Sequence, residues 1–371
     1  MPPNPSQQDN CAFALWNRGS KPLQLDFLGN FAYSCFMTKS STYTTLAQYG
    51  EFGLIERIKR QAKNHEGIVL GIGDDCSAAQ IPEGKLLLTS KDLLIEEIHF
   101  RRCWTDMYSL GRKSAAVNLS DIAAMGGVPH HLYLGVGLPS DLSMAELDNF
   151  CHGFLDEANE ANVTLSGGDT CRSPEKLIIS VTVQGSVSAT EMVRRSKAQE
   201  GEAIYVTGTL GDSALALALL QRNKLPSDFL SQRHHRPTPR LAMGQALASQ
   251  GIASSMIDIS DGLLSDLKHI LDQSGLGAHI DQQQIPLSPD VRDHLNSHPE
   301  DEELILQGGE DYELLFTAPS SYSNDLEALS NRLNLPLTRI GTLLNERDGL
   351  TLVQLDGQER QVEAHGFNHF R

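Results

Sequence analysis

The chain has 371 residues, of which 40% are hydrophobic, and its formal net charge is −17 at pH 7. This length and apolar fraction are sufficient for two domains of ordinary size. The excess of 47 acidic over 30 basic residues argues against binding to DNA or RNA, and no apolar run approaches the length of a membrane helix. An acidic protein can still bind a phosphorylated small molecule if metal ions reverse the local charge.

Six cysteines are scattered along the chain without a C-x-x-C pair, which argues against a zinc or dithiol motif. They are Cys11, Cys35, Cys76, Cys103, Cys151 and Cys171. Scattered thiols in a chain of this length are typical of a reducing compartment. We therefore predict a cytoplasmic protein.

Residues 1–48 differ from the rest of the chain, because they mix Asn, Gln, Ser and Pro with isolated aromatic residues and show no sustained period. We predict a poorly ordered extension. Segment 11–36 contains charges and lacks the compact apolar core of a signal peptide. Met37 lies shortly before the first patterned segment and is an alternative start of translation.

Patterned sequence begins at Gly50 and predicts a first α/β unit that ends near residue 189. Ser143 and Glu146 have the spacing of a capping box at the start of a helix. The expected helices are 51–62, 108–125 and 143–162, and the expected strands are 68–75, 85–92, 131–139, 164–170 and 176–187.

A second α/β unit begins near Thr190. Its expected elements are a strand, glycine turn and helix over 203–220, a helix at 236–251, a strand, acidic turn and helix over 255–275, a strand at 313–319, a helix at 322–333 and a strand at 337–344. The fold class is therefore α+β, or mixed α/β, with domains at 49–189 and 190–371.

Seven aspartates lie at the ends of apolar runs, each close to glycine, serine or alanine. They are Asp74, Asp75, Asp92, Asp121, Asp169, Asp258 and Asp261. Buried carboxylates are costly without a positive partner, and few Lys or Arg occur in these segments. The set predicts several Mg²⁺ ions, which bind a few carboxylates together with phosphate oxygens.

Some of these aspartates also have structural interpretations. The pair Asp74 and Asp75 could form a polar turn, and Asp261 could cap a helix. Asp121 is harder to explain without a ligand, because it lies in an apolar helix of small residues. Asp169 follows two glycines, which let a ligand approach the backbone closely.

The chain lacks a Walker A motif, which argues against a P-loop kinase, and the strand from residue 203 leads into GTLGDS rather than G-x-G-x-x-G. GTLGDS has two interpretations. It could present backbone N–H groups to a phosphate, or it could be a tight turn in which Asp212 caps the helix.

The remaining polar candidates also stay open. His99 lies among apolar residues and is typical of a core histidine, and Glu310 lies in a glycine turn before a strand. The pair 194–195 (Arg-Arg) could meet a nucleotide phosphate or form a solvated surface pair. Residues 234–236 (His-His-Arg) are predicted to form a loop rather than a metal site.

Nine segments together resemble the thiamine-monophosphate kinase family, within the superfamily of aminoimidazole ribonucleotide synthetase, selenophosphate synthetase and the hydrogenase maturation factor that dehydrates a carbamoyl group. They are GEFGLI (50–55), GIGDDC (71–76), NLSDIAAMGG (118–127), SGGDT (166–170), YVTGTLGDSALAL (205–217), RPTPRL (236–241), IDISDGL (257–263), GGEDYEL (308–314) and GFNHF (366–370). GGEDYEL and GFNHF indicate the thiamine branch.

The resemblance implies a two-domain aminoimidazole ribonucleotide synthetase-like fold, whose N-terminal strands join those of a partner in a homodimer. ATP would bind between N-terminal domains and pass its γ-phosphate directly to thiamine monophosphate, which is the last step of thiamine diphosphate biosynthesis. The partners implied are ATP, thiamine monophosphate and several Mg²⁺ ions, with no nucleic acid and no membrane.

The resemblance also implies roles for individual residues. The metal ligands would be Asp75, Asp92, Asp121, Asp169, Asp258 and Asp261. ATP would contact Gly168, Asp169, Arg195 and Ser260. Thiamine monophosphate would contact His99, Glu310 and Phe367, the last by stacking on a ring. Because the acceptor is an ionised phosphate, we expect no Ser or Cys nucleophile and no phosphoenzyme.

Three residues depart from the family pattern. Lys91 precedes Asp92 where the family usually has Thr, Glu97 replaces a frequent glycine, and Asn368 replaces an acidic residue. Lys91 puts one metal ligand in doubt. It keeps open the alternative of a nucleotide-binding regulatory protein without turnover, next to that of another ATP-dependent synthetase of the superfamily.

Overall fold

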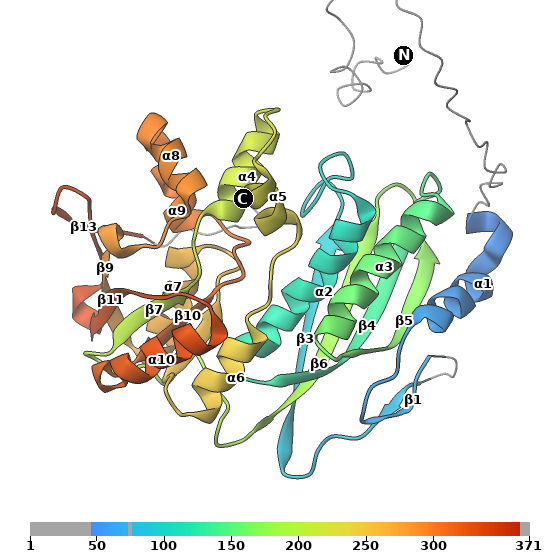
Figure 1. Ribbon diagram of the computed structural model, residues 1–371, viewed down its shortest axis with the longest axis horizontal. Coiled ribbons are helices and arrows are strands. Elements are labelled where there is room, and N and C mark those ends of the chain that lie inside the picture. The colour runs from blue at the N-terminus through green and yellow to red at the C-terminus, as the bar shows by residue number, and fades with distance from the viewer. Residues whose placement is uncertain (1–45, 73–75, 364–371) are drawn as a thin grey trace, which may run out of the picture. The chain divides into compact units, whose positions relative to one another are not determined.

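The computed structural model describes residues 46–72 and 76–363, arranged as helices and strands around two main sheets (Figure 1). Three predicted features lie outside the described residues: most of the N-terminal extension, Asp74 with Asp75, and the GFNHF segment with Phe367 and Asn368. Helix α1 (Leu46–Gln61) begins within the region that was expected to be an extension. None of the described helices is long and apolar enough to cross a membrane.

The N-terminal unit is a four-stranded sheet in the order β3-β6-β4-β5. Its strands are β3 (Lys85–Ile95), β6 (Ile178–Ser188), β4 (Val128–Leu138) and β5 (Thr164–Arg172). β4 and β5 are parallel, whereas β3–β6 and β6–β4 are antiparallel. A small ladder joins β1 (Ile68–Leu70) to β2 (Ala78–Ala79).

Helices α2 (Met107–Ala124) and α3 (Met144–Glu160) lie side by side over one face of this sheet (Figure 1). Their small residues permit backbone contact, since a Cβ on Gly111 would lie 2.0 Å from the carbonyl oxygen of Phe150, and one on Gly153 would lie 1.9 Å from that of Tyr108. The predicted capping box of Ser143 and Glu146 is confirmed at the start of α3.

The two faces of the four-stranded sheet differ in character. Along β3, side chains alternate between the face under α2 and the opposite face. The opposite face carries exposed apolar side chains, among them Leu87 at 47% and Leu93 at 50% exposure.

The C-terminal unit is a seven-stranded sheet in the order β13-β12-β9-β11-β7-β10-β8. All neighbours are antiparallel except β12 and β9. Its strands are β7 (Ala203–Thr207), β8 (Ser255–Asp258), β9 (Leu276–Asp281), β10 (Leu314–Ala318), β11 (Leu337–Asn345), β12 (Leu350–Val353) and β13 (Glu359–Gln361). Strands β7 and β10 are buried along their whole length, as the continuous apolar runs of their sequences favour.

Seven α-helices accompany this sheet within the described chain. They are α4 (Asp212–Gln221), α5 (Asp228–His235), α6 (Leu241–Ser249), α7 (Leu263–Ser274), α8 (Pro289–Ser297), α9 (Glu303–Gln307) and α10 (Ser323–Leu333). Two expectations were wrong here. The helix predicted from residue 236 begins only at Leu241, and 234–235 end helix α5 instead of forming a loop.

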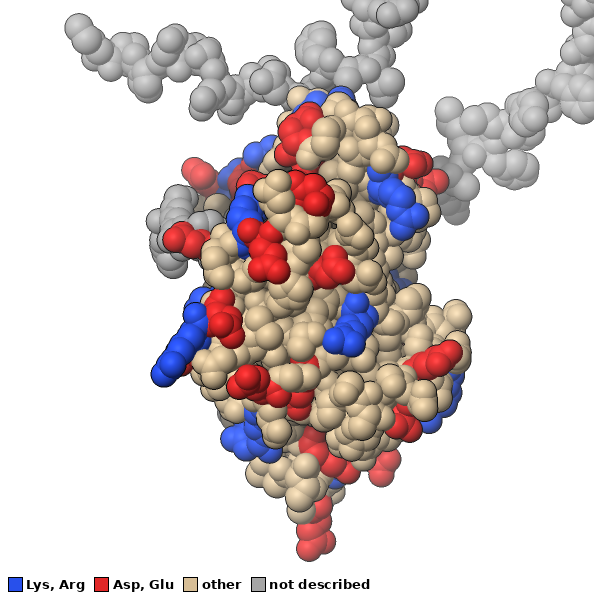
Figure 2. Space-filling model, turned by 90° about the vertical axis from the view of Figure 1, so that its left-hand side faces the viewer, with Lys and Arg blue, Asp and Glu red and all other residues tan. Residues whose placement is uncertain are grey.

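Acidic and basic side chains are interspersed on the face of the molecule that Figure 2 shows. Red and blue groups alternate there without a continuous basic patch. Acidic groups are therefore spread over this face rather than gathered in one part of it.

Helix α2 also joins the two units. A Cβ on Gly244 of α6 would lie 2.1 Å from the carbonyl oxygen of Ala123 on α2, so the two helices touch backbone to backbone. The Val193 N–H donates to the carbonyl of Met125 at 3.3 Å. The segment between β6 and β7, where the sequence places the domain boundary, therefore runs beside the end of α2.

Candidate active site

Three of the predicted aspartates converge where α2, β3 and β8 meet. Asp92 lies on β3, Asp121 on α2 and Asp258 at the end of β8. Burial raises the pKa of Asp92 to about 7 and that of Asp258 to about 8, and the charge of Asp121 contributes to both shifts. These carboxylates, which come from both units, therefore lie close enough to repel one another.

Serine hydroxyl groups donate to two of these carboxylates, and Asn118 holds the backbone of the third aspartate. The Ser90 hydroxyl donates to Asp121 Oδ2 at 2.6 Å, and the Ser120 hydroxyl donates to Asp258 Oδ2 at 2.6 Å. The backbone N–H of Asp92 donates to Asn118 Oδ1 at 3.2 Å. Burial raises the pKa of Asp121 as well, although the Ser90 hydroxyl and the charge of Arg195 partly oppose this shift.

Within the described chain, none of the three carboxylates forms an ion pair with Lys or Arg. Among residues 46–72 and 76–363, no group of three Asp, Glu, His or Cys side chains is placed so that it could hold one metal ion. The described part of the site is thus a group of mutually repelling carboxylates that depends on a further positive charge.

Asp266, which the sequence reasoning missed, organises the acidic turn after β8. Its Oδ2 accepts the backbone N–H groups of residues 260, 261 and 262 at 3.0–3.1 Å. Burial raises its pKa to about 7. Because Ser260 and Asp261 lie in this turn, Asp266 fixes their backbone. The sequence signal for this role was the position of Asp266 in the first turn of the helix that follows Gly262.

The GGEDYEL loop packs against the same turn. The Glu310 N–H donates to the Ser260 carbonyl at 2.8 Å, and the Tyr312 N–H donates to the Ile259 carbonyl at 2.9 Å. Glu310 and Tyr312 both have left-handed backbones, with φ of 66° and 51°. Non-glycine residues seldom adopt this conformation, and it is concentrated at functional sites.

Side chains of the loop reach the N-terminal unit. Lys113 Nζ on α2 pairs with Glu310 Oε1 at 3.0 Å, and His234 Nδ1 lies 3.5 Å from Glu310 Oε2. Tyr312 packs against the N-terminal core. Burial raises its pKa well above the usual value, and four carboxylates add to this shift. They are Glu310, Asp92, Asp258 and Asp121. Sequence reasoning missed Lys113 and Tyr312.

Asp169 belongs to a different face of the N-terminal sheet. The strand register aligns Asp92 with Val181, Leu134 and Gly168, and it aligns Asp169 with Gly135 in the next row. Adjacent rows of a sheet point to opposite faces. The structure therefore brings Asp92, Asp121 and Asp258 together and places Asp169 on the opposite, open face.

Lys91 also points to that open face, where its Nζ donates to Ser180 Oγ at 2.5 Å and to Thr182 Oγ1 at 3.4 Å. The cation next to Asp92 in sequence is thus turned away from the converging carboxylates.

His99 closes the turn after β3, because its Nδ1 accepts the Ile95 N–H at 3.0 Å. In the same turn Glu97 has a φ of 74°. This left-handed conformation explains why glycine is suited to that position.

The structure decides between the interpretations of GTLGDS. The backbone N–H groups of Gly211 and Ser213 donate to Asp311 at 2.8 and 3.4 Å, so a carboxylate of the chain occupies the place proposed for a phosphate. Asp212 is the first residue of α4 rather than its cap, and its carboxylate accepts from Thr209. Both interpretations of the motif were therefore wrong in detail.

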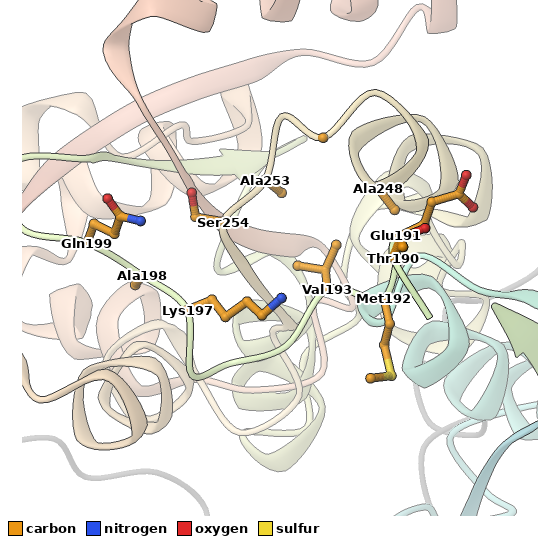
Figure 3. Close-up of a pocket in the computed structure, with 11 residues that line it drawn as sticks. Thr190, Glu191, Met192, Val193, Lys197, Ala198, Gln199, Ala248, Ala253 and Ser254 are labelled. Atoms are coloured by element: carbon orange, nitrogen blue, oxygen red, sulfur yellow. The ribbon is translucent and has the colours of Figure 1, made fainter. Parts of the chain in front are cut away.

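A groove of about 500 Å³ runs along the segment between the two units (Figure 3). Thr190, Glu191, Met192 and Lys197 line it together with Ala248 and Ser254. None of the described residues predicted to bind metal or substrate lines this groove.

Both units of the chain are similar to known proteins. Residues 73–187 match the family model of the AIR synthase related protein, N-terminal domain, and residues 199–353 match that of the C-terminal domain. The chain is 42% identical over 331 residues to the thiamine-monophosphate kinase of Escherichia coli (strain K12), covering 86% of this chain and 98% of that protein.

Solved structures agree with this. The crystal structure of thiamine-monophosphate kinase from Stenotrophomonas maltophilia K279a has a TM-score of 0.75 at 39% identity, with 83% of this chain and 97% of that chain covered. AaThiL complexed with AMPPCP and TMP has a TM-score of 0.69 at 34% identity, with 89% of this chain and 100% of that chain covered.

Proposed function

The chain belongs to the thiamine-monophosphate kinase family of AIR synthase related proteins, and we propose that it phosphorylates thiamine monophosphate with ATP to give thiamine diphosphate. The fold class and the resemblance predicted from the sequence are confirmed. The observation that carries the proposal is the near-complete coverage of the Escherichia coli kinase at 42% identity. The AaThiL complex, which holds AMPPCP and TMP, supports both substrates.

The chemistry of three of the carboxylates suits a divalent cation, although the described residues alone do not complete a site for one. Asp92, Asp121 and Asp258 are acidic oxygen ligands that lie close together, largely desolvated and without an ion pair to Lys or Arg among the described residues. These are the ligands that Mg²⁺ prefers beside phosphate oxygens. We propose that they hold Mg²⁺ with Asp261 and with Asp75, which lies outside the described residues. Bound Mg²⁺ would neutralise the charge of the phosphates.

Asp169 lies on the other side of the N-terminal sheet from these three carboxylates. Its exposed carboxylate and the adjacent Gly168 lie in the middle of β5, where a nucleotide could approach the open face. We propose that Gly168, Asp169, Arg195 and Ser260 contact ATP, with Asp169 also binding metal. Arg195 lies close enough to Asp121 to lower its pKa, which supports a position near the phosphates.

The reaction demands positioning more than covalent chemistry. The accepting phosphate oxygen is already ionised near neutral pH, so no strong base is needed. Two like charges 4 Å apart repel by about 4 kcal/mol at an effective dielectric constant near 20. The chain's task is to hold two polyanions in contact and to exclude water, and no side chain needs to form a phosphoenzyme.

The thiamine moiety would contact Glu310 and His99, together with Phe367 from beyond the described residues. Glu310 reaches the region between the two units and lies beside Ser260, which is proposed to contact ATP. His99 donates its backbone N–H to the Ile95 carbonyl and thereby closes the β3 turn. Acceptor and donor would then meet near the turn that follows β8.

Two finer points are also proposals. The apolar open face of the N-terminal sheet, including Leu87 and Leu93, supports a homodimer in which this face is covered. Light scattering should give twice the chain mass of 40.6 kDa, and a charged replacement such as Leu93→Glu should give the mass of a monomer. A dimer that Leu93→Glu leaves intact would place the interface elsewhere. The free thiols of Cys76, Cys151 and Cys171 support a reducing cytoplasm as the location.

The proposed activity is tested by incubating the purified chain with ATP, Mg²⁺ and thiamine monophosphate and measuring thiamine diphosphate. Formation of ADP and thiamine diphosphate in equal amounts is expected. Binding of ATP without product would instead support a regulatory protein, and inertness toward thiamine monophosphate with turnover of another acceptor would support a different synthetase of the superfamily.

A further inference from the structure

Lys113 is a buried cation that neither the sequence motifs nor the family resemblance assigns to the site. It lies on α2 with only 3% of its surface exposed, among residues that are mainly small or apolar. A buried ammonium group is costly unless a negative group pairs with it. Its partner is Glu310, at 3.0 Å, on a loop of the other unit.

The surroundings of Glu310 make Lys113 its main source of positive charge. His234 lies 3.5 Å from the second Glu310 oxygen, but burial and the charge of Lys113 hold the pKa of His234 well below its usual value. Burial and Lys113 also lower the pKa of His235 to about 4. Both imidazoles are therefore neutral near pH 7, and Tyr312 is a neutral phenol there.

The loop that carries Glu310 depends on contacts of this kind. The left-handed backbone of Glu310, with a φ of 66°, is strained, and surrounding interactions must offset this strain. Its side chain is 25% exposed, so without Lys113 the carboxylate could turn toward water.

Helix α2 links this contact to the carboxylate cluster. Lys113 and Ser120 are two helical turns apart and lie on the same side of α2, about 10 Å from each other along its axis. Lys113 holds Glu310, and Ser120 donates to Asp258 at 2.6 Å. The helix α2 therefore sets the distance between Glu310, which is proposed to contact the acceptor, and Asp258, which is proposed to bind metal.

We propose that Lys113 is a positioning residue for the acceptor substrate, which holds the Glu310 carboxylate across the two units in the orientation that contacts the thiamine moiety. This inference rests on the proposed function, because Glu310 is placed at the acceptor by that proposal. Lys113 acts through Glu310 and takes no part in ATP binding.

The test compares wild type, Lys113→Met, Lys113→Arg, Glu310→Gln and the Lys113→Met/Glu310→Gln double variant. For Lys113→Met we expect the KM for thiamine monophosphate to rise about tenfold, as for one lost hydrogen bond to a charged group, with the KM for ATP unchanged within about twofold. Lys113→Arg, which keeps the charge, should restore most of the affinity. The double variant should be no worse than the poorer single variant.

Lys268→Met is the matched control, because Lys268 forms an exposed ion pair with Asp272 on α7. It should leave both KM values unchanged. Equal rises of both KM values in Lys113→Met, no rise at all, or additive effects in the double variant would overturn the inference. If Lys113→Met does not fold, Lys113→Gln takes its place: it should raise the KM for thiamine monophosphate and not that for ATP, and an equal rise of both or no rise at all would overturn the inference.

The wild-type measurement separates the two proposals. A wild-type protein that forms no thiamine diphosphate contradicts the proposed function, and this inference falls with it. A wild type that turns over while Lys113→Met behaves like Lys268→Met contradicts only the role of Lys113.

Discussion

Asp121 is the shared neighbour of two other carboxylates, the half-buried Asp92 and the buried Asp258, and its charge raises the pKa of both. The three side chains come from a helix and two strands of different sheets, and hydroxyl groups of Ser90 and Ser120 orient two of them. Such a group is unfavourable in isolation and becomes favourable with divalent cations. At the scale of single residues, the site is therefore defined by charge that the described chain does not itself balance.

We expect Asp121→Asn to lower kcat by more than about 100-fold, because a ligand of the proposed metal is lost, while the protein stays folded. Asparagine has nearly the same size and can still accept the Ser90 hydrogen bond. Steady-state rates at saturating Mg²⁺ and a melting curve check both parts. Asp325→Asn on the exposed side of α10 serves as the control. Near-normal turnover of a folded Asp121→Asn protein would falsify the metal assignment.

At the scale of elements, helix α2 packs against elements of both units. It packs backbone to backbone on α3 through Gly111 and Gly153 and on α6 through Gly244, and it covers the N-terminal sheet. Fifteen of its residues are buried, including the polar Lys113, Asn118 and Ser120. Its small side chains are therefore a requirement of close packing, and Lys113, Asn118 and Ser120 contact residues of the site.

Gly111→Ala should destabilise the protein by roughly 1–3 kcal/mol, because the new methyl group would lie 2.0 Å from the Phe150 carbonyl oxygen and force α2 and α3 apart. Helix propensity alone favours alanine by roughly 1 kcal/mol, so the sign of the change distinguishes the two effects. Denaturant unfolding measures it. Gly135→Ala is the control, because there is room for its Cβ, which would lie at an ordinary contact distance of 3.4 Å from Ser180. An unchanged or increased stability of Gly111→Ala would show that α2 and α3 are not in backbone contact.

At the scale of the whole molecule, the carboxylate cluster lies where the N-terminal and C-terminal units meet, and it takes residues from both. Asp92 and Asp121 belong to the first unit and Asp258 to the second. Any cation they share would stabilise the junction, and its removal would leave their repulsion between the units.

The stability of the metal-free protein should fall as the pH rises from about 4 to 8. Asp92 and Asp258 have folded-state pKa values of about 7 and about 8, above the ordinary 3.8, so the folded state retains protons that the unfolded state loses. The stability that Asp92 and Asp258 contribute is fully present below their pKa in the unfolded state, and it is lost as the pH rises through their pKa in the folded state.

Adding Mg²⁺ should oppose this loss, since the metal requires the deprotonated form. Melting temperatures in EDTA and in Mg²⁺, at pH 6 and pH 8, measure the effect. The gain from Mg²⁺ should be larger at pH 8, and an equal gain at both pH values would show that these carboxylates do not bind the ion.

Much of this protein follows from local sequence patterns. Apolar periodicity and glycine turns located most helices and strands, and the capping box at Ser143 marks the start of α3. The positions of Asp92, Asp121 and Asp258 beside small residues indicated a metal site before any geometry was known. These features are local, because a few neighbouring residues determine them. The short strands β12 and β13 and helix α5 lacked such a signal.

Only the tertiary structure decided which distant groups meet. Strand register turns Asp169 and Lys91 to the open face, away from Asp92. Asp311 fills the GTLGDS turn, Asp266 holds the acidic turn, and Lys113 reaches Glu310 over a long sequence separation. The physical reason is that the partner of a buried charge is set by packing between elements, which the residues next to it in sequence do not determine.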